Sequence, residues 1–99
     1  MTSSETIVQL SQLALQLLEE DARKIETLIQ VQMENLTTRK CPLYEEVLDT
    51  QMYGLSREID FAVRAGLLDE AEGKQLLMKM EKKLASLYEA MEAIRNETL

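Results

Sequence analysis

The sequence of 99 residues contains no histidine and no tryptophan, and it has only one cysteine, one proline and three glycines. Without imidazole, a Ser–His or Cys–His nucleophile is excluded, and a metal site has to use carboxylates, carbonyls or one thiolate. The single cysteine, Cys41, also excludes an internal disulfide framework. We therefore expect that the protein is not an enzyme.

Long apolar runs and N-terminal basic clusters are also missing. No run approaches the roughly 18 apolar residues that span a bilayer, and the first residues lack the pattern of a signal peptide. Eighteen acidic against eleven basic residues give a formal charge of −7, which disfavours DNA or an anionic membrane as a direct partner. We expect a cytoplasmic protein that contacts neither nucleic acid nor membrane directly.

Residues typical of helices make up most of the remaining sequence. Apolar side chains recur at helical spacing in three segments, which predicts helices over about residues 5–37, 42–65 and 70–95 of a single domain. The first is about 50 Å long, longer than a compact bundle of this size needs. Part of it is therefore expected to pack against a second copy, and the pattern leaves open whether it folds within its own subunit or across a dimer.

The ends of the predicted helices carry recognisable signals. Pro42 suits the first position of a helix, Gly66 suits the left-handed residue after one, and Asp69 three residues before Glu72 forms a capping box. Gly54 lies inside the second helix, where we expect close approach of another helix, or alternatively a kink. The predicted fold is all-α, a three-helix bundle with a long N-terminal helix, a C-terminal antiparallel hairpin and a homodimeric state.

Polar residues gather on the side of the second helix that faces away from its apolar stripe. The candidate metal ligands at its start are Cys41, Glu45, Glu46 and Asp49, three of them carboxylates suited to a divalent cation. One helix cannot surround an ion, because Cys41 to Asp49 spans about 12 Å, so further ligands must come from another helix, subunit or partner. The alternative is a solvated face whose acids offset the helix dipole.

The second half of the same helix carries the candidate partner-binding residues Tyr53, Arg57, Asp60 and Arg64. Asp60 and Arg64 are four residues apart, the spacing of a helical ion pair. The sequence therefore predicts a mixed aromatic and charged surface beside the acidic one.

Residues 41–64, which read CPLYEEVLDTQMYGLSREIDFAVR, closely resemble the signature of the YlaN family, small helical proteins of Gram-positive bacteria. The flanking segments IQVQMENLT, at 29–37, and AGLLD, at 65–69, are similar to the same family, and the resemblance covers about residues 20–90. It implies a cytoplasmic, non-catalytic role in iron homeostasis, with binding of ferrous iron and of the ferric uptake repressor to relieve its repression.

The resemblance does not assign iron ligands, so the candidates above come from the residues alone. Iron held mainly by carboxylates would be bound weakly and exchangeably. A chain of charge −7 is suited to dock on a basic DNA-binding regulator, since complementary charge speeds encounter. The alternative hypothesis is a structural helical homo-oligomer or adaptor without a metal role.

Overall fold

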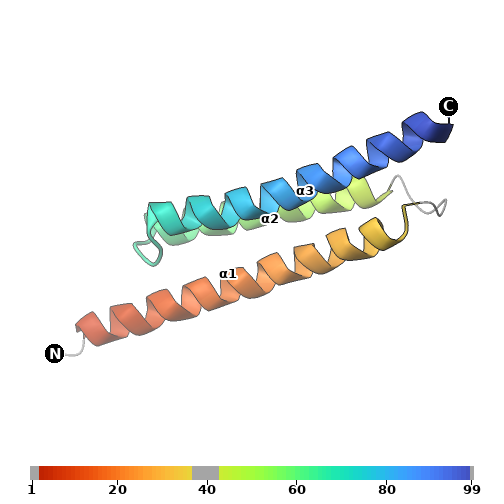
Figure 1. The fold of residues 1–99 in the computed structure, drawn as a ribbon. Helices are drawn as coiled ribbons and strands as arrows, with labels where there is room; N and C mark the ends of the chain where they lie inside the picture. The colour runs from red at the N-terminus through yellow and green to blue at the C-terminus, as the bar shows by residue number, and fades with distance from the viewer. Residues whose placement is uncertain (1–2, 37–42, 99) are drawn as a thin grey trace.

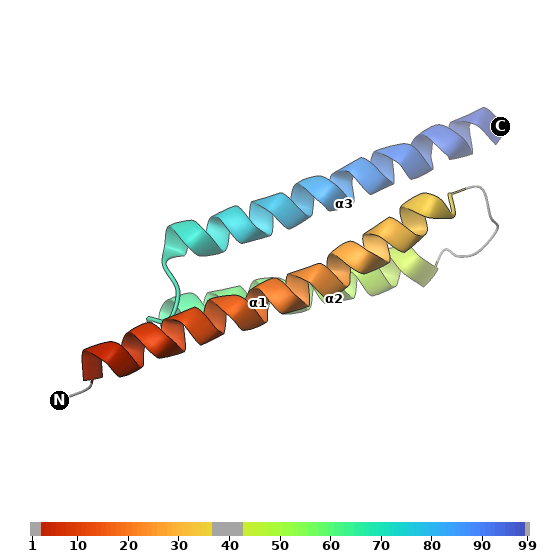
Figure 2. The same cartoon turned by 60° about the horizontal axis from the view of Figure 1, so that its bottom comes forward.

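The protein is described here from a computed structural model, which defines residues 3–36 and 43–98. It consists of three helices, α1 (Ser3–Glu34), α2 (Leu43–Arg64) and α3 (Glu70–Thr98). The chain runs up α1, back along α2 and up again along α3, and each helix contacts both others (Figures 1 and 2). The predicted all-α bundle with a C-terminal antiparallel hairpin is confirmed. Within the described ranges, no helix has a stretch long and apolar enough to cross a membrane.

The helix ends differ from the predicted ones by a few residues. α1 begins two residues earlier than predicted and ends at Glu34, where the amide side chain of Asn35 donates to the Val31 carbonyl over 2.7 Å. α3 continues to Thr98, beyond the predicted end at Arg95. Its last turn is supported by ion pairs of Arg95 with Glu92 and with Glu45 of α2.

The turn between α2 and α3 forms as the sequence predicts. Gly66 has a φ of 77°, and its N–H donates to the Val63 carbonyl over 3.0 Å. The N–H of Leu67 donates to the Ala62 carbonyl over 2.9 Å, which completes a Schellman motif. α3 then begins at Glu70, directly after Asp69. This tight turn fixes the antiparallel register of α2 and α3.

The core runs along the centre of the bundle, between the three helices. It is built from residues at helical spacing on each of them: Leu18, Ala22, Ile25 and Ile29 of α1, Leu48, Met52, Leu55, Ile59 and Ala62 of α2, Leu68 of the turn, and Met80, Leu84 and Leu87 of α3. On α1 the buried stripe therefore starts only at Leu18. The apolar residues before it, such as Ile7 and Leu10, are about half exposed, and the N-terminal part of α1 projects beyond the hairpin in Figure 1.

The two glycines inside helices have opposite surroundings. Gly54 of α2 is exposed and a Cβ there would meet nothing within 4 Å, while α2 continues through it. The predicted close approach of another helix at Gly54 is thus wrong within this chain, while the alternative of a kink stays a prediction. The close approach occurs instead at Gly73 of α3, where a Cβ would lie 2.8 Å from Cγ2 of Ile59.

Candidate functional site

The candidate site is the outer surface of α2, the side turned away from the core. We use this name for the seven described residues that the sequence predicts to bind metal or partner: Glu45, Glu46, Asp49, Tyr53, Arg57, Asp60 and Arg64. The buried residues Leu48, Leu55 and Ala62 anchor the opposite side of the helix. The helix continues from Leu43 to Arg64, so these seven side chains form one continuous strip.

At the acidic end of the strip, two carboxylates turn toward α3. The hydroxyl of Tyr88 donates a hydrogen bond to Oδ1 of Asp49 over 2.7 Å. One turn earlier, Nη2 of Arg95 lies 3.9 Å from Oε1 of Glu45. Glu46 is exposed to solvent. The structure therefore pairs Glu45 and Asp49 with one cation and one phenol of α3, an arrangement that balances part of their charge.

Tyr88 is the titrating group that this arrangement changes most. Burial raises the pKa of its phenol above the ordinary value of 10.0, and the hydrogen bond to Asp49 and the charges of Asp49 and Glu45 raise it further. The phenol is therefore held in its neutral, hydrogen-donating form throughout the physiological range. Any cation that bound Asp49 would compete with this hydrogen bond.

The described part of the chain contains no group of three or more Cys, Asp or Glu side chains close enough to hold a metal ion. Cys41, the fourth candidate ligand, lies outside the described residues. Glu45 and Asp49 share the α3 side of the helix, where both have polar partners, and Glu46 is exposed. The set of Cys41, Glu45, Glu46 and Asp49 accordingly stays a prediction.

The other end of the strip is organised around Asp60. Its Oδ2 lies 3.1 Å from Nε of Arg64, as the spacing predicts, and 3.9 Å from Nη1 of Arg57. Tyr53, between this cluster and the acidic end, is 67% exposed. The hydroxyl of Ser56 donates to the Tyr53 carbonyl over 2.7 Å. This end thus presents two guanidinium groups, one carboxylate and one aromatic ring to solvent.

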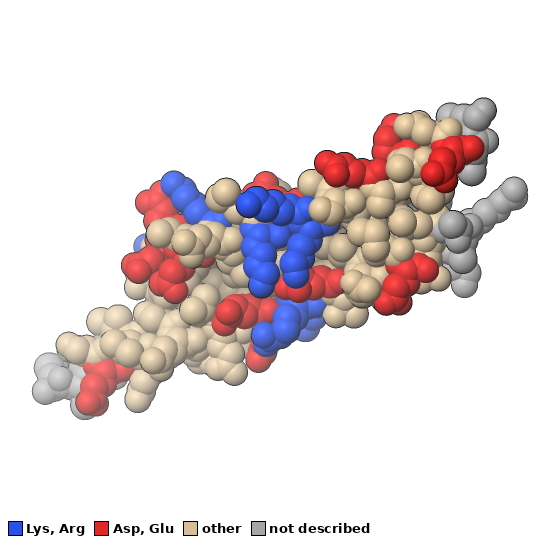
Figure 3. Space-filling view, viewed as in Figure 1, with Lys and Arg blue, Asp and Glu red and all other residues tan. Residues whose placement is uncertain are grey.

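One polar contact, between Glu26 and Lys83, holds α1 against the hairpin. Nζ of Lys83 lies 2.6 Å from Oε2 of Glu26, and this bond lowers the pKa of Glu26 below its ordinary 4.5, against the opposing effect of burial. Lys79 and Arg23 are also near Glu26, and basic side chains gather at the middle of this face in Figure 3. On the α2 side, burial and the nearby carboxylate of Asp21 raise the pKa of Glu58.

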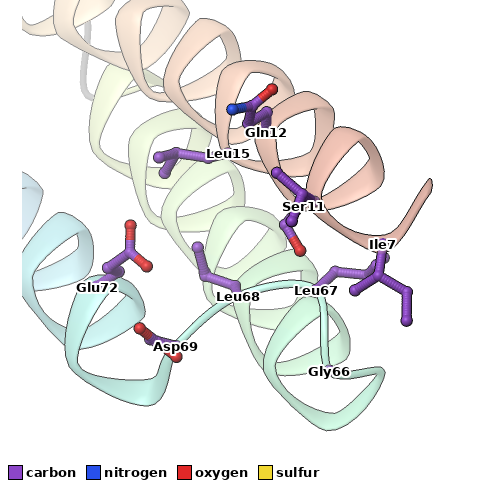
Figure 4. A pocket seen from close by; sticks show the side chains of 10 residues that line it. Ile7, Ser11, Gln12, Leu15, Gly66, Leu67, Leu68, Asp69 and Glu72 are labelled. Atoms are coloured by element: carbon purple, nitrogen blue, oxygen red, sulfur yellow. The ribbon is translucent and has the colours of Figure 1, made fainter. Parts of the chain in front are cut away.

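A separate hollow lies between the N-terminal part of α1 and the turn that precedes α3 (Figure 4). Ile7, Leu15 and Leu68 supply apolar side chains, while Asp69 and Glu72 from the start of α3 bring two carboxylates to one side. None of the candidate metal or partner residues lines it. The hollow and the outer surface of α2 are therefore independent features.

Sequence reasoning missed the residues of α3 that complete the acidic end. Neither Tyr88 nor Arg95 was predicted as part of the site, and residue 95 was predicted only as the end of the third helix. The spacing within one helix places a residue on a face, but the pairing of Asp49 with Tyr88 depends on how two helices are aligned. The only signal in the sequence for these contacts was a tyrosine and an arginine beside the apolar stripe of α3.

Comparison with known proteins identifies the family. The family described as "Protein of unknown function (DUF1507)" matches residues 9–93. The chain belongs to this family. It is 62% identical to the UPF0358 protein YlaN of Bacillus subtilis over 91 residues, which cover 92% of this chain and 98% of that protein. A UPF0358 protein of Bacillus pumilus is 65% identical over 88 residues, covering 89% and 95% respectively.

The resemblance to the YlaN family is thus confirmed, and it extends further toward the N-terminus than predicted. The matched region starts at residue 9, whereas the sequence resemblance was placed at about residue 20. The family therefore includes the projecting part of α1 as well as the outer surface of α2.

Proposed function

We propose that this protein is a non-catalytic, cytoplasmic regulator of iron homeostasis that binds the ferric uptake repressor, and ferrous iron, to relieve repression. Its supports are membership of the family that includes YlaN, the formal charge of −7 and the outer surface of α2. The observation that carries the proposal is Tyr53. A large aromatic ring that is 67% exposed among charged residues is typical of the residues that contribute most to protein interfaces.

The repressor half of the proposal rests on charge and exposure. Three acids precede Tyr53 on the outer surface of α2, and a repressor that binds DNA presents basic residues of the opposite sign. Docking there would compete with DNA for the same basic surface. Because exposed charges are screened, the encounter should slow as salt rises.

Replacing Tyr53 tests the repressor half. We expect Tyr53→Ala to weaken binding to the purified repressor by about tenfold or more, as loss of an interface aromatic does. The matched control is Met78→Ala, which removes a side chain that is also exposed but lies on α3. Equal affinities for wild type and Tyr53→Ala would reject the outer surface of α2 as the docking site.

The iron half rests on Glu45 and Asp49, which lie one turn apart on the same side of α2. Anaerobic calorimetric titration of ferrous iron should show weaker binding for Glu45→Ala/Asp49→Ala than for wild type. Glu70→Ala/Glu72→Ala removes two acids from α3 and should leave the affinity unchanged. Because Tyr88 donates to Asp49, iron binding at Asp49 should also alter the Tyr88 absorbance or fluorescence. Unchanged affinity in the Glu45→Ala/Asp49→Ala variant would remove these ligands.

A further inference from the structure

The face formed by the N-terminal part of α1 and the C-terminal part of α2 is apolar and uncovered within the chain. Leu10, Leu13 and Leu17 of α1 are 46%, 49% and 50% exposed, and Phe61 of α2 is 64% exposed. Leu17 and Phe61 line one groove with Ala14 and Leu67, and the charged residues Arg57 and Glu58 stand at its α2 side. We call the surface formed by Leu10, Leu13, Leu17 and Phe61 the α1/α2 face. Apolar side chains at this density are more than the scattered exposure of an ordinary surface.

The same face is almost free of charge along α1. Between Ser3 and Leu18 the only charged residue is Glu5, although 29% of the whole sequence is charged. On the side that Figure 3 shows, where α1 meets α3, the projecting end of α1 is also tan apart from acidic atoms near its tip. Two copies of a chain with charge −7 repel each other over most of their surface, but they repel least here.

Next to the groove lies a hollow beside Gly54. Lys24 and Asp21 of α1 and Glu58 of α2 stand at its sides, and the buried Ile25 and Leu55 lie beneath. A side chain at position 54 would fill part of it, since a Cβ there meets nothing within 4 Å. Glycine inside a helix lowers the stability of that helix. Gly54 is exposed and has open space beside it, so a side chain from another molecule can fit there.

The distance from Leu10 to Leu17 along α1 equals the distance from Gly54 to Phe61 along α2, which allows two copies of the chain to fit together. Leu10 lies seven residues before Leu17, and Gly54 lies seven residues before Phe61, about 10 Å along each helix. α1 and α2 are antiparallel, and Leu17 and Phe61 are at the same level of the bundle. A two-fold axis at this level brings Leu10 of one copy to the level of Gly54 of the other. We propose that the α1/α2 face binds a second copy of this chain as an antiparallel dimer, with Leu10 seated beside the partner's Gly54.

The exposed apolar area of the α1/α2 face is large enough for a second copy of the chain. With about 200 Å² for a fully exposed large apolar side chain, Leu10, Leu13, Leu17 and Phe61 expose roughly 400 Å² per chain. A standard interface buries about 800 Å² per partner, somewhat more than half of it apolar. The face thus supplies most of the apolar area of such an interface. A second copy is the occupant that satisfies both the projecting leucines and the hollow, because a two-fold dimer uses the same surface twice.

The oligomeric state of the purified protein tests the dimer, without iron or repressor present. Sedimentation should give twice the chain mass of 11.4 kDa for wild type. Leu17→Glu and Phe61→Glu should each sediment as monomers with unchanged helical circular dichroism, because both side chains are exposed in the chain itself. Met78→Glu, an equal change of charge on α3, should stay dimeric. A wild-type monomer at concentrations up to about 100 μM, or a dimer in both variants, would overturn the proposal.

Cysteine cross-linking tests the register. In a Cys41→Ser background, a mixture of the Leu10→Cys and Gly54→Cys chains should oxidise to a linked pair that contains one chain of each kind. Met78→Cys mixed with Gly54→Cys is the matched control and should yield little linked product. Efficient linking of Gly54→Cys chains to each other, or failure of the mixed pair to link, would contradict the proposed register.

Discussion

At the scale of single residues, the two glycines inside helices differ in whether the fold has room for a side chain. At Gly73 of α3 the chain needs a hydrogen, because a Cβ would lie 2.8 Å from Cγ2 of Ile59 and 3.3 Å from Cγ2 of Val63. Ile59 is a buried, β-branched residue and has little freedom to move. At Gly54 of α2 a Cβ would meet nothing within 4 Å.

The same substitution should therefore have opposite effects at these two positions. Gly73→Ala should lower the free energy of unfolding by about 1–3 kcal/mol, because the added carbon overpacks the α2–α3 contact. Gly54→Ala should raise it by up to about 1 kcal/mol, because alanine favours the helix. Urea unfolding at a concentration where the protein is monomeric measures both. Stabilisation by Gly73→Ala would show that the close contact is absent.

Tyr88 makes a prediction about pH. Its pKa is raised in the folded chain, so the stability that it contributes is complete below its unfolded pKa of about 10 and is lost as pH rises through the folded value. Tyr88→Phe should cost about 1 kcal/mol at pH 7 through loss of the hydrogen bond to Asp49. The difference from wild type should shrink above pH 10.

Ultraviolet titration of tyrosinate, with urea unfolding at pH 7, checks this prediction. Wild type should show a tyrosine component that ionises late, and Tyr88→Phe should lack that component. The control is Tyr53→Phe, which removes a hydroxyl that is exposed to solvent. If Tyr53→Phe lost the late component instead, the raised pKa would belong to Tyr53 and the prediction for Tyr88 would be wrong.

At the scale of helices, the ion pair of Glu26 and Lys83 holds α1 against α3. The pKa of Glu26 is lowered in the folded chain, so its contribution to stability is present above the unfolded value and lost as pH falls through the folded one. Glu26→Gln should therefore lower stability by about 0.5–1 kcal/mol at pH 7.

Unfolding by urea at pH 7 and below pH 4 checks the contribution of Glu26. The difference between Glu26→Gln and wild type should shrink as pH falls below 4.5 and disappear once the pH lies below the lowered pKa of Glu26. Glu19→Gln makes the same change at an exposed position of α1 and should have little effect at either pH. A difference that stayed constant as the pH was lowered would show that packing, rather than charge, explains it.

The helices themselves were predictable because their signals are local. Apolar spacing, Gly66 and Asp69 predicted three helices, the Schellman turn and the start of α3. The same spacing did not distinguish Leu18, which is buried, from Leu17, which is half exposed. Consecutive residues of a helix point about 100° apart, so Leu18 faces the hairpin while Leu17 lies at the edge of the apolar stripe, and the spacing alone does not place the centre of a wide stripe.

The candidate site was predictable in position but not in its contacts. The outer surface of α2 and the pair of Asp60 with Arg64 follow from spacing within one helix. The partners of Asp49 and Glu45 come from α3, more than 35 residues later in the sequence. Such contacts depend on the relative register of two helices, which the periodicity of either helix leaves undetermined.

At the scale of the whole molecule, the proposals use two neighbouring surfaces that meet at Arg57. The outer surface of α2 is proposed for the repressor and its acidic end for iron, while the α1/α2 face is proposed for a second copy of the chain. Tyr53 does not line the groove that holds Phe61, so the two surfaces share Arg57 but have different aromatic residues. A dimer would present two repressor-binding surfaces, which raises the effective affinity for any partner that offers two binding sites.

The central proposal is that the outer surface of α2 removes the ferric uptake repressor from DNA. Fluorescence anisotropy of labelled operator DNA bound to the metal-loaded repressor measures this directly as the protein is added. Wild type should release the DNA, with release weakening as salt rises, and Glu46→Gln/Tyr53→Ala/Asp60→Asn should need at least about ten times the concentration. Equal release by wild type and this variant, or no release by wild type, would contradict the proposal.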